Sequence, residues 1–107
     1  MNRDEFYRWF DQTGPDAIIG MSRDVLLDWL GCRGIAVPTQ VSYACLDVLN
    51  GGARPMAGIR QSWGEIFSTA VELLAGQLSR NETGLPAVPK VTLIDGVWCD
   101  GPTVAGK

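Results

Sequence analysis

The side chains best suited to nucleophilic or metal chemistry in this chain are three cysteines, Cys32, Cys45 and Cys99. Their number is odd and no two are spaced as C-x-x-C, so we expect no disulfide framework and reduced thiols. No histidine is present, which removes the commonest general base and the commonest transition-metal ligand together. We therefore expect no metal site, and we expect Cys45 to be a small core residue.

Catalysis without histidine would need paired carboxylates or a buried lysine. Lysine occurs only at Lys90 and Lys107. The final V-A-G-K is too short to form a phosphate-binding G-x-x-x-x-G-K-[ST] loop. We expect that the protein is not an enzyme and that it uses no cofactor.

The composition is that of an ordinary globular chain, with 107 residues, 46% of them hydrophobic and 20% charged. This length predicts one domain over 1–107. No apolar run is long enough to cross a membrane, and the acidic, aromatic start MNRDEFYRWF is unlike a secretory signal. We therefore expect a cytoplasmic protein that does not bind membranes. Within the domain we expect helices over 1–80, an extended Pro/Gly segment over 81–90, a β-hairpin over 91–100 and a tail over 101–107.

Helical signals dominate the first 80 residues. Asn2 and Glu5 are positioned to cap a helix that Gly14 ends, and Ser62 with Glu65 forms a second S-x-x-E capping pattern. Apolar residues recur at helical spacing within the predicted helices, and this pattern places Trp29 and Trp63 in the core. The predicted helices cover residues 3–13, 15–20, 23–31, 39–50 and 63–79.

Two other segments predict non-helical structure. The glycine- and proline-rich run 51–61 reads as an irregular loop. Near the C-terminus, two β-type runs flank Asp95-Gly96, a pair typical of a two-residue hairpin turn. The expected fold is mainly α, with four to five short helices around one core, a helix-turn-helix corner and a C-terminal β-hairpin.

The corner is predicted from the stretch IGMSRDVLLDW, residues 19–29. Gly20 would make the turn, Ser22 would cap the second helix, and Arg23 would meet DNA. The inward residues of such a corner would be Ile19, Met21, Leu26 and Trp29.

Residues 15–50 resemble the Cro/repressor-like helix-turn-helix regulators of phages and mobile elements. The resemblance implies a small, dimeric, DNA-binding transcriptional regulator. For this function the expected DNA-contacting residues are Ser22, Arg23 and Arg33, together with Arg54 and Arg60 at the loop that follows residue 50.

The distribution of charge keeps a second function open. Residues 1–30 hold three arginines against six acidic residues, and so contain all of the chain's net charge of −3. Asp24 and Asp28 lie on or beside the expected DNA-reading face, where phosphates would repel them. The alternative is a small acidic protein-binding module, an inhibitor or adaptor that docks on a basic host protein and does not bind DNA. Its expected contact residues are Asp4, Glu5, Trp9, Asp11 and Trp98.

A homodimer is compatible with either function. Helix-turn-helix regulators usually bind paired half-sites as dimers. We expect the 63–79 helix or the edge of the hairpin to provide the contact between two copies.

Overall fold

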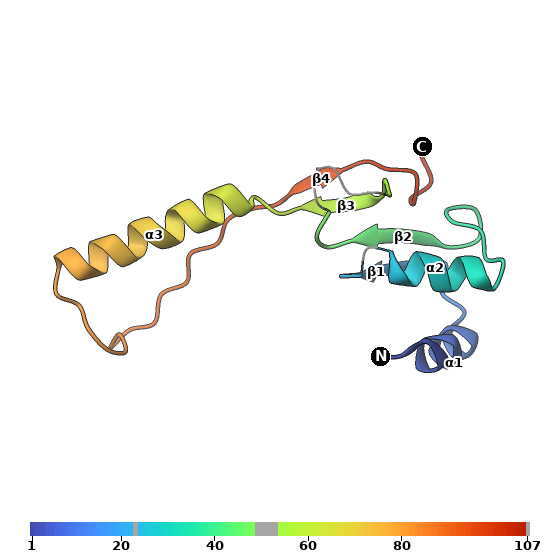
Figure 1. Ribbon diagram of the computed structural model, residues 1–107, viewed down its shortest axis with the longest axis horizontal. Coiled ribbons are helices and arrows are strands. Elements are labelled where there is room, and N and C mark those ends of the chain that lie inside the picture. Colours follow the sequence, from blue (N-terminus) through green and yellow to red (C-terminus); the bar gives the residue numbers. More distant parts are fainter. Residues whose placement is uncertain (23, 49–53, 107) are drawn as a thin grey trace. The chain divides into compact units, whose positions relative to one another are not determined.

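The computed structural model describes residues 1–22, 24–48 and 54–106. The chain forms two compact units, one of residues 1–61 with 97–107 and one of residues 62–96. Across the described residues there are three helices and four strands (Figure 1). The first unit contains α1 (Arg3–Thr13), β1 (Ala17–Gly20), α2 (Val25–Cys32), β2 (Ser42–Cys45), β3 (Ala57–Arg60) and β4 (Val97–Cys99), and the second contains α3 (Trp63–Ser79).

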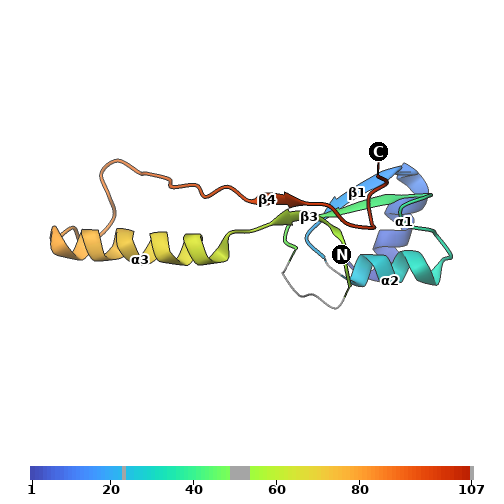
Figure 2. The ribbon, with the colours of Figure 1, turned by 90° about the horizontal axis from the view of Figure 1, so that it is seen from above.

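The strands form one mixed sheet in the order β1-β2-β3-β4 (Figure 1), and its strands β3 and β4 also lie side by side in Figure 2. β1 runs parallel to β2, with Gly20 level with Cys45. β2 runs parallel to β3, and β4 closes the other edge antiparallel to β3, with Trp98 opposite Ile59. The fold is therefore a small α/β arrangement in which α1 and α2 accompany a largely parallel sheet.

The core lies between the two helices and one face of this sheet. Strand side chains point alternately to opposite faces, so the paired residues Ile18 and Tyr43 share a face, and both are buried. Phe6 of α1 and Leu30 of α2 pack against that face. Ile19, on the opposite face of β1, is 70% exposed.

The expectation of a mainly α fold is wrong, and the error begins at residues 15–20. This segment contains strand β1 instead of a helix, so the described residues form no helix-turn-helix corner. Two consecutive isoleucines favour a strand, and the segment is too short for a stable helix. Ile19 and Met21, expected inside the corner, are exposed, whereas Leu26 and Trp29 do pack against the core.

The predicted helix over 39–50 is also wrong. Its described part contains β2, and Val41, Tyr43 and Cys45 are buried in alternation with the less buried Ser42 and Ala44. This alternation has the period of two that a strand requires. Cys45 is a core residue as expected, although it lies on a strand.

Two further corrections concern β3 and β4. The described part of the run 51–61 is not wholly irregular, because Ala57–Arg60 forms a strand. The predicted hairpin is absent from the described residues, since Val97–Cys99 pairs with β3 and residues 91–94 form no strand. A turn signal at Asp95-Gly96 does not decide which strand the following residues pair with.

The predicted helices over 3–13 and 63–79 are confirmed, and the one over 23–31 is close to the observed α2. α1 spans Arg3–Thr13, and its Asn2–Glu5 capping box is present. α2 begins two residues later and ends one residue later than expected. α3 spans Trp63–Ser79 as predicted, but Ser62 makes no side-chain cap and no residue of α3 is buried. No helix in the described part of the chain is long and apolar enough to cross a membrane.

Candidate interaction surface on α1 and α2

α1 is a well-defined helix because both of its ends are capped. The Asn2 side chain accepts a hydrogen bond from the backbone N–H of Glu5, and the Glu5 carboxylate accepts one from the backbone N–H of Asn2, each 2.9 Å long. Gly14 ends the helix in a left-handed conformation with φ 57°, which glycine adopts without steric cost. These caps fix where α1 begins and ends, and therefore which residues lie on its exposed face.

An aromatic cluster anchors α1 to α2. The Phe6 ring is buried, and its centroid lies 5.8 Å from that of Trp9 and 5.5 Å from that of Trp29. The rings of Tyr7 and Phe10 are also in contact with it. Trp9 is 36% exposed, so a large aromatic side chain at this site is only partly covered by its own chain.

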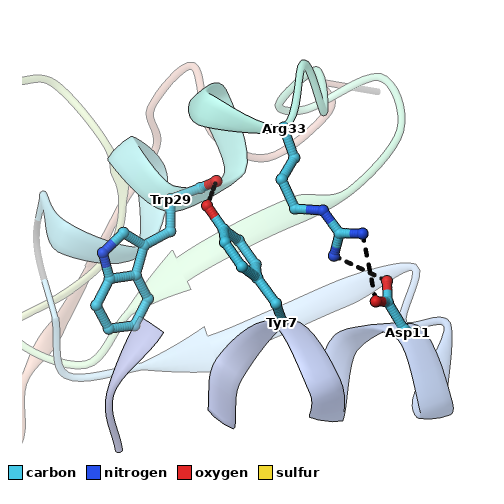
Figure 3. A network of polar contacts seen from close by, with 4 residues as sticks. All are labelled: Tyr7, Asp11, Trp29 and Arg33. Atoms are coloured by element: carbon cyan, nitrogen blue, oxygen red, sulfur yellow. Dashed lines mark hydrogen bonds and ion pairs between the residues drawn. The ribbon is translucent and has the colours of Figure 1, made fainter. Parts of the chain in front are cut away.

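A polar network holds the same two helices together (Figure 3). The Tyr7 hydroxyl donates a hydrogen bond of 2.8 Å to the backbone carbonyl of Trp29. The Arg33 guanidinium donates two hydrogen bonds to Asp11, and it lies 4.8 Å from the centroid of the Tyr7 ring. The hydrogen bond to Asp11 is the main cause that raises the pKa of Arg33.

Four of the five residues expected to bind a protein partner lie together on α1. They are Asp4, Glu5, Trp9 and Asp11, and each is exposed. The fifth, Trp98, lies on β4, where its indole N–H donates a hydrogen bond of 2.8 Å to Asp100. Sequence reasoning missed the contribution of α2, because it treated Trp29 only as a core residue.

The residues expected to bind DNA are not brought together in the same way. Arg33 pairs with Asp11, and Arg54 pairs with Asp28 at 2.8 Å and with Asp24 at 3.9 Å. Ser22 does not cap α2, whose first turn follows Asp24. Arg60 lies on β3, and Arg23 lies outside the described residues.

A second polar region lies where the parallel strands end. β1 and β2 end side by side at Gly20 and Cys45, and the Leu46 backbone N–H donates a hydrogen bond of 2.9 Å to the Gly20 carbonyl. Ser22 follows the end of β1 and Asp47 follows the end of β2. Sequence reasoning missed this edge because it assigned both strands to helices.

The second unit presents apolar surface instead. Ile66 and Leu73 of α3 line a hollow of about 350 Å³ together with residues 92–94. The neighbouring face of α3 exposes four large apolar side chains, of which Phe67 is 63% exposed. The others are Val71, Leu74 and Leu78.

No protein-family model matches this chain, and no curated protein or solved structure is significantly similar to it.

Proposed function

We propose that this chain is a protein-interaction module that binds a partner through the α1 surface, defined as Asp4, Glu5, Arg8, Trp9 and the adjoining Trp29. The observation that carries the proposal is Trp9, an aromatic side chain of α1 that remains 36% exposed beside a buried aromatic cluster. Tryptophan, tyrosine and arginine are the residues that most often dominate binding energy at protein interfaces. Here a tryptophan lies on the same helix as the exposed charged residues Asp4, Glu5 and Arg8, a combination that suits an interface with an apolar centre and a polar rim.

The rigidity of the α1 surface supports the proposal. Both ends of α1 are capped, and Tyr7 and Asp11 connect the helix to α2 by hydrogen bonds. A surface that is already ordered loses less conformational entropy when it binds a partner.

DNA binding is less well supported by the same fold. That hypothesis depended on a helical corner over residues 15–31, and the fold has strand β1 in its place. Arg33 and Arg54, two of its expected phosphate contacts, form ion pairs with aspartates. We therefore favour a protein partner, with the cytoplasm as the expected site of action.

The proposal is tested by site-specific photo-cross-linking in the cytoplasm of expressing cells. A photoreactive phenylalanine analogue replaces Trp9 in one variant and Ser68, an exposed residue of α3, in the control. We expect a discrete adduct from position 9 that is absent from position 68. No adduct from position 9, or the same adducts from both positions, would contradict the proposal.

A further inference from the structure

We propose that the partner of the α1 surface is a second copy of this chain, with the two α1 helices packed antiparallel across a two-fold axis. This inference rests on the proposed function and names its partner. It begins from the charges that α1 presents to solvent. Asp4 and Glu5 lie in its first turn, and Arg8 follows one turn later.

Glu5 is held in the capping box, whereas the charges of Asp4 and Arg8 are available for contacts with another molecule. Asp4 and Arg8 are exposed, and neither forms an ion pair with another described residue. They stand four positions apart, a spacing at which an aspartate and an arginine commonly pair within one helix. In this structure they do not, so both side chains are free to reach across an interface.

The pattern fits a two-fold axis. In an isologous contact, residue i of one copy meets residue j of the other, and j meets i. Antiparallel helices centred near position 6 bring Arg8 of each copy level with Asp4 of the other, and Glu5 lies next to it. The two-fold symmetry then produces two identical ion pairs. Trp9, the residue after Arg8, adds apolar contact beside these pairs.

Charge complementarity favours a second copy over an unrelated partner. A uniformly basic surface would attract Asp4 and Glu5 but would repel Arg8, and a uniformly acidic surface would do the reverse. A helix with the opposite order of charges places an opposite charge against both Asp4 and Arg8. An antiparallel copy of α1 is such a helix.

The expected dimer is weak and sensitive to salt. α1 has 11 residues, and at about 1.5 Å per residue it is roughly 16 Å long. We expect two helices of this length to bury less than the roughly 1,200 Å² of total surface area that most stable complexes bury. We therefore expect a Kd in the micromolar range that rises with ionic strength, because exposed ion pairs are screened.

The test is sedimentation equilibrium of the purified full-length chain over a wide concentration range. Arg8→Glu and Asp4→Arg each place like charges opposite one another, so each is expected to raise the dimer Kd about tenfold or more. An equimolar mixture of the two variants restores opposite charges at every contact and is expected to dimerise like the wild type. Lys90→Glu is the matched control for the charge change, and it is expected to leave the Kd within about twofold of the wild-type value, because Lys90 is an exposed residue outside the α1 surface.

Several outcomes would overturn the inference. They are a wild-type monomer at every concentration, a dimer indifferent to Arg8→Glu, and a mixture that fails to recover. The photo-cross-linking experiment separates this failure from failure of the proposed function. An adduct from position 9 with a different protein keeps the interaction module and rejects the second copy, whereas no adduct at all rejects both.

Discussion

Asp11 of α1 and Arg33, the residue that follows α2, are joined by two hydrogen bonds of 2.8 and 3.3 Å although 22 positions separate them in the sequence. The same Arg33 guanidinium lies over the Tyr7 ring, whose hydroxyl is bound to the backbone of α2. One arginine therefore connects the end of α1 to the end of α2. This connection orders the α1 surface without occupying Trp9 or Arg8.

The Asp11–Arg33 pair predicts a modest but specific contribution to stability. The two side chains are 58% and 36% exposed, so solvent screens their attraction. We expect Arg33→Met to lower the free energy of unfolding slightly but measurably, because it removes both the ion pair and the contact with Tyr7. A double-mutant cycle with Asp11→Asn, measured by urea unfolding, is expected to give a small favourable coupling. A coupling of zero would mean that the pair does not connect the helices in solution.

We predict that replacing Thr103 lowers stability more, because its buried hydroxyl both donates and accepts a hydrogen bond. It donates to the carbonyl of Tyr43 at 2.7 Å and accepts from the backbone N–H of Ala57 at 2.9 Å. Thr103→Val leaves both backbone groups without a partner, and we expect it to cost about 2–4 kcal/mol of unfolding free energy. Thr103→Ser keeps the hydroxyl and is expected to cost less than about 1 kcal/mol. Hydrogen exchange at the Ala57 amide, faster in Thr103→Val only, provides the local readout.

Gly58 lies where the backbones of β2 and β3 approach each other closely, and we predict that a larger residue there destabilises the protein. A Cβ atom at this position would lie 2.0 Å from the carbonyl oxygen of Cys45, and the backbone φ is +156°. We expect Gly58→Ala to destabilise the protein by about 3 kcal/mol or more, through steric overlap and backbone strain. Gly64→Ala in α3, where no atom lies within 4 Å of the added Cβ, is expected to gain about 0.5–1 kcal/mol. Equal effects of the two substitutions in thermal unfolding would argue against the β2–β3 pairing.

The helices of this protein could be predicted from local signals, and its strands could not. The cap of Asn2 and the stop at Gly14 are encoded within α1 itself, so its bounds follow from sequence. β1 and β2 are four residues each, and their stability comes from pairing with each other across a long separation in the chain. In so short a segment, apolar residues satisfy a helical and a strand pattern equally well. The alternation of Val41, Tyr43 and Cys45 was the available signal for β2.

The candidate interaction surface could be predicted only in part. Asp4, Glu5, Trp9 and Asp11 share one helix, so their proximity follows from the prediction of that helix. The contribution of Trp29 and the pairing of Asp11 with Arg33 depend on how α2 packs on α1. No local pattern contains that information, because it arises from a tertiary contact through Phe6.

We predict that the exposed apolar face of α3 binds a hydrophobic fluorescent dye. Phe67, Val71 and Leu74 are each more than half exposed, an unusually large apolar surface for one helix. We expect the wild type to enhance the fluorescence of an anilinonaphthalene dye, and Phe67→Asp with Leu74→Asp to reduce this enhancement severalfold. Glu65→Asp with Glu72→Asp, which changes the acidic residues of α3, is the control. Dye binding that all three proteins share would place the exposed apolar surface elsewhere.

We predict that the protein loses stability at high pH because the hydroxyl of Tyr43 is buried. Its side chain is buried on β2, and its hydroxyl donates a hydrogen bond to the backbone carbonyl of Ser22. Burial, with a smaller contribution from Cys45, raises the pKa of Tyr43 to about 12, against 10.0 for an ordinary tyrosine. The unfolded chain therefore releases this proton at lower pH than the folded chain does. The stabilisation is fully present below pH 10 and is lost as the pH rises to 12.

The measurement for Tyr43 is urea unfolding of the wild type and of Tyr43→Phe between pH 8 and pH 12. We expect the free energy of unfolding of the wild type to fall by up to about 2–3 kcal/mol more than that of Tyr43→Phe over the upper part of this range. Other groups that titrate in this pH range contribute equally to both proteins and cancel in the difference. Two parallel curves would show that the Tyr43 hydroxyl ionises as easily in the folded chain as in the unfolded one, and that it is not buried against Ser22.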